Sequence, residues 1–212
     1  MRHWTKWMAL VLCLIAAGLI VKGQPSFETR WRRMETKYKP MLDSRSILID
    51  PGELLQLLYD HGITLTILDV RSERDFNLFH LADAVRGDID DLERFHWSEL
   101  PSNAVVVVMS NGETDAVEAW KRLKLLHVTN AYVLEGGANG WLAAFGNPAE
   151  VVKREVIDTG GGSGDEVLAY RFTAALGGRH AVSRPDVKLE GTRVFEKKVK
   201  TQSQARKSGG CG

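Results

Sequence analysis

Cysteine is scarce in this sequence of 212 residues, and its scarcity excludes two classes of protein. Only Cys13 and Cys211 are present, the first inside an apolar run and the second beside the end of the chain. A disulfide-stapled fold and a thiolate zinc site both need several closely spaced cysteines. We therefore predict neither a disulfide scaffold nor a cysteine-based metal site, and no pattern in the sequence indicates a cofactor.

Long apolar runs are also few, and the one that stands out is Met8 to Val21, 14 residues that are uncharged and mostly apolar. A membrane-spanning helix needs about 20 residues, whereas a cleaved export signal needs about 7–15. Trp4 and Trp7 extend the run with an aromatic collar of the kind that lies at membrane interfaces. We favour an uncleaved single-pass anchor over residues 1–24, with residues 4–21 in the membrane, and a cleaved signal remains the alternative.

The orientation of that anchor is open. Short N-terminal anchors of bacterial proteins usually export the domain attached to them, which predicts a periplasmic or otherwise extracytoplasmic body. Five basic residues between positions 30 and 39 favour the opposite orientation under the positive-inside rule.

A large net charge is missing as well, since the chain totals only +1, but the charges are unevenly distributed. Residues 46–150 carry 17 acidic and 7 basic side chains, a net of −10. The residues before them carry 9 basic and 3 acidic side chains, and the residues after them carry 12 and 7. An acidic body repels phosphates, so we predict no nucleic-acid binding. A protein partner could bind the acidic body or the basic tail, although charged runs are commonly just solvated surface.

The middle of the chain alternates between strand-like and helix-like patterns. After a basic linker over residues 25–45, with a short helix around Trp31, the predicted elements are a strand at 46–49, a helix from Pro51, a strand at 64–70, short helices within 72–100, a strand at 104–109, a helix after it, a strand at 131–134 and a last helix. Such alternation predicts an α/β domain with a parallel sheet over residues 46–148. Residues 149–212 read as a glycine linker, a short helix at 166–177 and a flexible, basic, disordered tail, so we expect the domain to fold without them.

Three stretches of this domain resemble the rhodanese-like family. They are "ILDVRSERDFNLFHLADAV" (67–85), "VVVVMSNGETDA" (105–116) and "VLEGGANGW" (133–141). The resemblance implies a parallel five-stranded sheet flanked by helices, with a reactive loop after the fourth strand. In the family this loop begins with a cysteine that carries sulfur as a persulfide.

This sequence departs from the family where the chemistry would occur, because Met109 stands at the cysteine position. A shift of one residue would place Ser110 there, and neither a thioether nor a hydroxyl can carry sulfane sulfur. The loop Ser110, Asn111, Gly112, Glu113 and Thr114 still has the form of an anion cradle at a helix N-terminus. Active relatives often place an arginine in this loop, whereas this chain has acidic residues. We therefore assign no catalytic residue and read Met109 as a packing residue at the end of its strand.

The other matching residues have structural interpretations. Six of them are expected to shape the domain: Asp69, Arg71, His80, Gly136, Gly137 and Trp141. Phe79 replaces the glycine that precedes the family's histidine, which leaves the shape of that turn open.

Three functions are consistent with these observations. The favoured one is a membrane-tethered, non-catalytic binding or scaffolding module. The second is a sulfur carrier that uses the tail thiol of Cys211, and the third is an anion sensor built on the loop.

Overall fold

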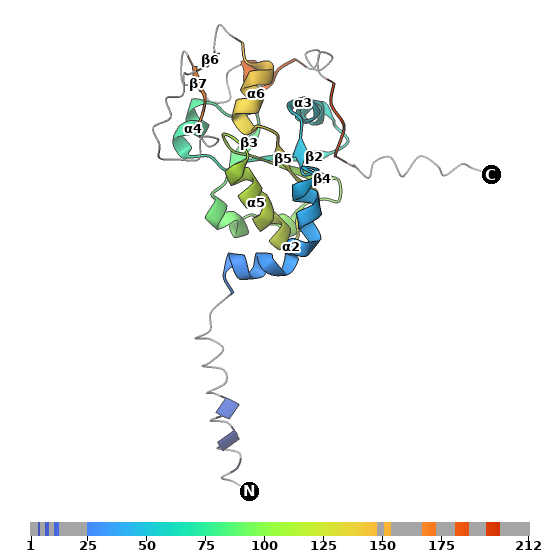
Figure 1. Ribbon diagram of the computed structural model, residues 1–212, viewed down its shortest axis with the longest axis vertical. Coiled ribbons are helices and arrows are strands. Elements are labelled where there is room, and N and C mark those ends of the chain that lie inside the picture. The colour runs from blue at the N-terminus through green and yellow to red at the C-terminus, as the bar shows by residue number, and fades with distance from the viewer. Residues whose placement is uncertain are drawn as a thin grey trace, which may run out of the picture. The chain divides into compact units, whose positions relative to one another are not determined.

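The computed structural model describes residues 4, 7, 8, 11, 12, 25–147, 151–153, 167–172, 181–186 and 194–199 (Figure 1). The chain divides into two compact units, residues 1–36 and 37–212. Within the described residues the helices and strands are, in chain order, α2 (Phe27–Asp43), β1 (Leu48–Ile49), α3 (Pro51–Tyr59), β2 (Thr64–Asp69), α4 (Glu73–Leu78), β3 (Ala84–Arg86), η1 (Ile89–Arg94), η2 (Trp97–Glu99), β4 (Ala104–Met109), α5 (Thr114–Leu125), β5 (Ala131–Leu134), α6 (Gly137–Phe145), β6 (Val151–Lys153), β7 (Tyr170–Phe172) and η5 (Ala181–Ser183).

Five parallel strands form the main sheet in the order β1-β5-β4-β2-β3. All six residues of β4 are buried, because a central parallel strand is covered on both faces. Its pairing with β2 runs from Thr64 opposite Ala104 to Asp69 opposite Met109. The predicted α/β fold with a five-stranded parallel sheet is therefore present. Strand β3 supplies the fifth strand from within 72–100, where the sequence indicated only a loop and short helices.

Helices cover both faces of this sheet (Figure 1). Helix α5 buries Ala116, Ala119, Trp120 and Leu123, which share one helical face because they are three or four residues apart. Helices α3 and α6 contact each other and lie on the opposite side of the sheet from α5. The main apolar core lies between these two helices and the sheet.

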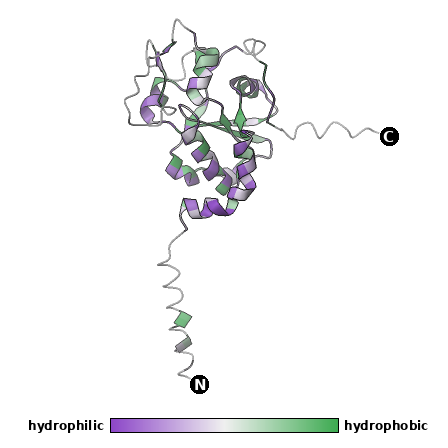
Figure 2. Ribbon diagram, in the orientation of Figure 1, coloured by the Kyte–Doolittle hydropathy of each residue, from purple (hydrophilic) through white to green (hydrophobic). Residues whose placement is uncertain are grey.

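Helix α2 is longer than the predicted short helix around Trp31. It runs for 17 residues and is mostly hydrophilic, as its largely purple colour in Figure 2 shows. Its many Arg, Lys, Glu and Met residues are good helix formers, and the Ser26 hydroxyl accepts a hydrogen bond from Thr29 N at 3.3 Å near its start. The basic linker predicted over 25–45 is therefore mainly a helix.

The segments after residue 148 also differ from the prediction. Val151, Leu168 and Val182 are at most 6% exposed and belong to the main core. Strands β6 and β7 pair antiparallel, so the helix predicted at 166–177 is wrong for residues 170–172. The linker-and-tail interpretation does not hold for these described segments. Their burial depends on contacts with distant residues, which a short apolar pattern does not reveal.

Two other expectations, the membrane anchor and the role of Cys211, concern parts of the chain that the structure largely does not describe. The proposed anchor lies mostly in residues that the structure does not describe, and Cys211 is likewise outside the described residues. Among the helical residues that are described, none belongs to a helix with both the length and the apolar character needed to cross a bilayer.

Candidate functional site

The loop after β4 carries the residues at which the family resemblance places its chemistry. Met109 is the last residue of β4, is fully buried and belongs to the main core. Its carbonyl oxygen accepts a hydrogen bond from Val70 N at 3.0 Å. The thioether at the family's cysteine position thus packs inside the domain.

Ser110, the other aligned residue, holds the loop together from within. Its hydroxyl is fully buried and donates to Gly112 O at 3.0 Å. The same oxygen accepts from Ala116 N at 3.3 Å, in the first turn of α5. This side chain therefore supports the loop-to-helix junction, where α5 has no side-chain cap on Glu113.

The carbonyl groups of the loop meet the start of α6. Ala138 N donates to Ser110 O at 2.8 Å, and Asn139 N donates to Asn111 O at 3.0 Å. Gly136 and Gly137 have φ angles of 67° and 56°, in the left-handed region that favours glycine. A Cβ on Gly137 would lie only 2.2 Å from Gly112 O. The two glycines therefore permit the turn and the close contact between α6 and the loop.

The Glu113 carboxylate lies beside this loop and bonds to a main-chain amide and to an arginine. Glu113 Oε1 accepts from Gly136 N at 2.8 Å and lies 3.0 Å from Arg45 Nη2. Arg45 Nη2 is also 3.5 Å from Glu135 Oε1. The neighbouring cleft has a volume of about 470 Å³, and three acidic side chains contribute to its lining: Asp50, Glu113 and Glu135. This electrostatic environment is unfavourable for an anion such as thiosulfate.

Arg45 is the main residue of this site that the sequence did not indicate. It is 68 positions before Glu113 and has a φ of 53°, which is uncommon for a non-glycine residue. The guanidinium that approaches the loop thus comes from the turn before β1. No motif connects these positions in the sequence.

Asp69 and Arg71 form a buried ion pair beside the same loop. Arg71 Nη2 lies 2.6 Å from Asp69 Oδ2 and also donates to Phe79 O at 2.6 Å. Arg71 Nη1 donates to Asn111 Oδ1 at 3.4 Å, and Asn111 Nδ2 donates to Asp75 Oδ2 at 2.8 Å. Because the Arg71 side chain is only 1% exposed, its guanidinium ties β2, α4 and the loop together and does not face solvent.

His80 and Trp141 are also held by main-chain contacts. His80 Nδ1 lies 2.8 Å from Phe76 O, and its ring stacks on Phe76 at a centroid distance of 4.1 Å. Trp141 is fully buried, and its Nε1 donates to Val182 O at 2.7 Å. Phe79, which replaces the family's glycine, has a φ of −159°, an extended conformation that any residue adopts.

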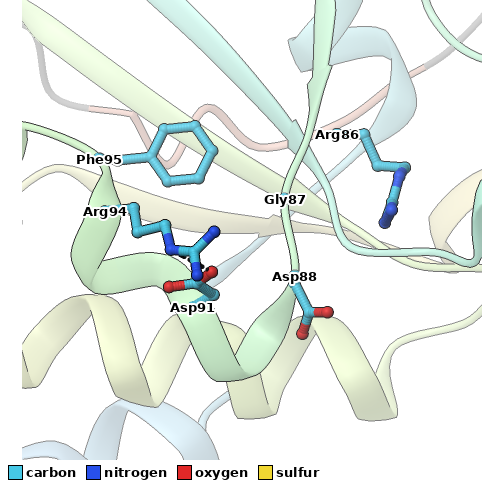
Figure 3. A pocket seen from close by; sticks show the side chains of 6 residues that line it. All are labelled: Arg86, Gly87, Asp88, Asp91, Arg94 and Phe95. Carbon is cyan, nitrogen blue, oxygen red and sulfur yellow. Dashed lines mark ion pairs between the residues drawn. The ribbon is translucent and has the colours of Figure 1, made fainter.

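A second cavity lies at the carboxyl end of β3 (Figure 3). It has a volume of about 350 Å³ and is lined by Arg86, Gly87, Asp88, Asp91, Arg94 and Phe95. Arg94 forms an ion pair with Asp91, so one of the two guanidinium groups already has an acidic partner. In the described part of the chain, no three His, Cys, Asp or Glu side chains gather in a way that could hold a metal ion.

Comparisons with known proteins support the resemblance to the rhodanese-like family. The family model described as the rhodanese-like domain matches residues 50–144. No curated protein matches the chain.

Several solved structures are similar to part of the chain. The rhodanese-like domain of an Anabaena sp. protein is 26% identical, covers 46% of this chain and 74% of its own, and has a TM-score of 0.40. A rhodanese-related protein of Thermoplasma volcanium is 22% identical over 45% of this chain and 89% of its own, with a TM-score of 0.38. A rhodanese-like domain protein of Staphylococcus aureus is 20% identical over 44% and 89%, also with a TM-score of 0.38. The match to the family model, together with the three motifs in order, identifies residues 50–144 of this chain as a rhodanese-like domain.

Proposed function

We propose that this rhodanese-like domain does not transfer sulfur and acts as a membrane-tethered binding or scaffolding module. The observation that carries the proposal is the fully buried Met109 at the family's cysteine position. A persulfide forms on a thiolate, and a thioether has no proton to lose. The neighbouring Ser110 hydroxyl is buried and already hydrogen-bonded.

The charges around the loop support the same proposal. Glu113 and Glu135 are placed beside the cleft, and Arg45 pairs with both. Arg71 is fully bonded inside the domain. An anionic sulfur donor would therefore approach a cleft with acidic walls, without a guanidinium group from the loop to bind it.

The membrane part of the proposal rests on the apolar run from Met8 to Val21 and its aromatic collar. Full-length protein should remain with the membrane fraction after carbonate extraction. A mature N-terminus found at Gln24 would instead establish a cleaved signal and remove the tether.

Sulfur transfer from thiosulfate to cyanide tests the catalytic part. We expect wild-type protein and Cys211→Ser to match a no-enzyme control. Met109→Cys should gain little turnover, because the Glu113 carboxylate would disfavour a thiolate and repel the donor. Met109→Cys combined with Glu113→Gln should gain more, since a glutamine oxygen can still accept from Gly136 N.

Two results would contradict the proposal in different ways. Turnover by the wild type that disappears in Cys211→Ser would establish the tail thiol as a sulfur carrier. Turnover that persists in Cys211→Ser would locate the activity elsewhere in the domain.

A further inference from the structure

A short segment near the C-terminus docks on helix α3, beside the cleft described above. Residues 194–199 form this strap, and its contacts are made by main-chain and side-chain atoms of three residues. Lys198 N and Val199 N donate to the same oxygen, Glu53 Oε1, at 2.9 and 2.7 Å. Phe195 lies so close to Gly52 that a Cβ there would be 2.7 Å from Phe195 Cε1. Val199 packs against the main core.

Glu53 is an unusual residue to find at this position. It is only 2% exposed, and its Oε2 has no hydrogen-bond partner in the described part of the chain. Burial raises the pKa of Glu53, whereas the two strap N–H groups and the nearby Lys198 and Lys197 lower it. A buried carboxyl group needs donors to offset its lost hydration, and the strap provides them.

The strap also reaches the residue that holds the loop after β4. Lys198 Nζ donates to Arg45 O at 3.2 Å, and the same carbonyl accepts from Leu48 N at 3.1 Å. Arg45 in turn directs its guanidinium at Glu113 and Glu135. The main chain of Arg45 is thus bonded both to the strap and within its own turn, while its side chain is bound to the loop.

We propose that residues 194–199 are a regulatory strap that controls the shape of the loop cleft. Docking on Glu53 places Lys198 against the Arg45 carbonyl, which holds the strained turn that aims the guanidinium at Glu113. Because Glu113 also binds Gly136 N, the coupling extends from the C-terminal segment to both walls of the cleft. Release of the strap frees Arg45 to leave Glu113 and opens the cleft.

Hydrogen–deuterium exchange of the full chain in detergent, read by mass spectrometry, tests this coupling. The reporters are the Gly136 amide, which donates to Glu113 Oε1, and the Ala116 amide, which donates to Ser110 Oγ. Phe195→Ala and a chain ending at residue 193 should undock the strap. Both should speed exchange in the peptide that contains Gly136 by about tenfold or more, the effect of losing one charge-assisted hydrogen bond. Exchange at Ala116 should rise by less, because its acceptor is a neutral hydroxyl.

The variant Lys198→Met distinguishes docking of the strap on Glu53 from its coupling to the loop through Arg45. The Lys198 and Val199 main-chain groups still bind Glu53 in this variant, so their exchange should stay slow while the Gly136 reporter speeds up. Glu196→Ala is the matched control, because Glu196 is an exposed residue of the same segment, and it should change neither region.

Two outcomes would overturn the proposal. Unchanged exchange at both reporters in the chain ending at 193 would show that the strap does not control the loop. Equal acceleration in β2 would show a general loss of stability in place of a local coupling. The readout is backbone exchange, so the result does not depend on whether the domain transfers sulfur.

Discussion

Leu168 provides a direct test of whether the segments after residue 148 belong to the domain. Its side chain is 3% exposed and packs in the main core, while its neighbour Val167 is 47% exposed. Replacing a buried leucine by alanine typically costs 2–5 kcal/mol, through lost burial and the cavity that remains. Total stabilities are about 5–15 kcal/mol, so Leu168→Ala should remove a substantial fraction.

Urea and thermal unfolding, followed by tryptophan fluorescence, would measure this effect. For a domain of this size a loss of 1 kcal/mol lowers Tm by about 2–4 °C, so Leu168→Ala should lower it by roughly 4–20 °C. Val167→Ala is the control and should change stability by less than about 0.5 kcal/mol, as exposed substitutions usually do.

The opposite result would refute the structural reasoning. If Leu168→Ala and Val167→Ala unfold at the wild-type midpoint, the segment is not part of the core. A chain ending at residue 147 would then also keep its full stability, as the sequence pattern alone predicts. The structure predicts that such a chain is severely destabilised, because Val151 and Val182 leave the core together with Leu168.

Three further predictions concern the interior. Arg71→Met should lower the free energy of unfolding, measured in urea, by about 3–5 kcal/mol because it leaves the buried Asp69 carboxylate unpaired. Arg94→Met removes an exposed ion pair and should lower it by less than about 1 kcal/mol. Burial lowers the pKa of Lys124 from 10.5 to about 8, so the folded protein binds fewer protons than the unfolded chain between these values. Wild-type stability relative to Lys124→Met should therefore rise between about pH 8 and pH 10.5, by up to about 3 kcal/mol, and a flat difference in denaturant midpoints would contradict this. Gly137→Ala should cost more than about 2 kcal/mol in the same assay, because φ is positive and a Cβ would collide with carbonyl oxygens of the loop; a variant with wild-type stability would rule out that contact.

The sequence by itself determined four of the five strands of the sheet and the absence of a loop thiol. The run Val105 to Val108 is continuously apolar, and a strand buried on both faces of a parallel sheet requires that pattern. Met109 comes directly after it, so the lack of a cysteine at this point is read from the sequence alone and needs no coordinates. The sequence also placed the glycines at 136 and 137 in a turn. Strand β3 has only three residues, a run too short for its apolar pattern to predict a strand.

Only the tertiary structure decided which distant groups complete the site. Arg45 and Glu113 are 68 positions apart, and Glu53 and Val199 are 146 apart, so no local periodicity connects either pair. The segments that supply Leu168 and Val182 are short, with six described residues each, 167–172 and 181–186. A local sequence pattern predicts a helix or strand when apolar residues recur at regular spacing on the face that packs against the core. A single apolar side chain that fills a gap in the core produces no such pattern. The strap, the Arg45 contact and the C-terminal part of the core therefore arise from packing between segments that are remote in the chain.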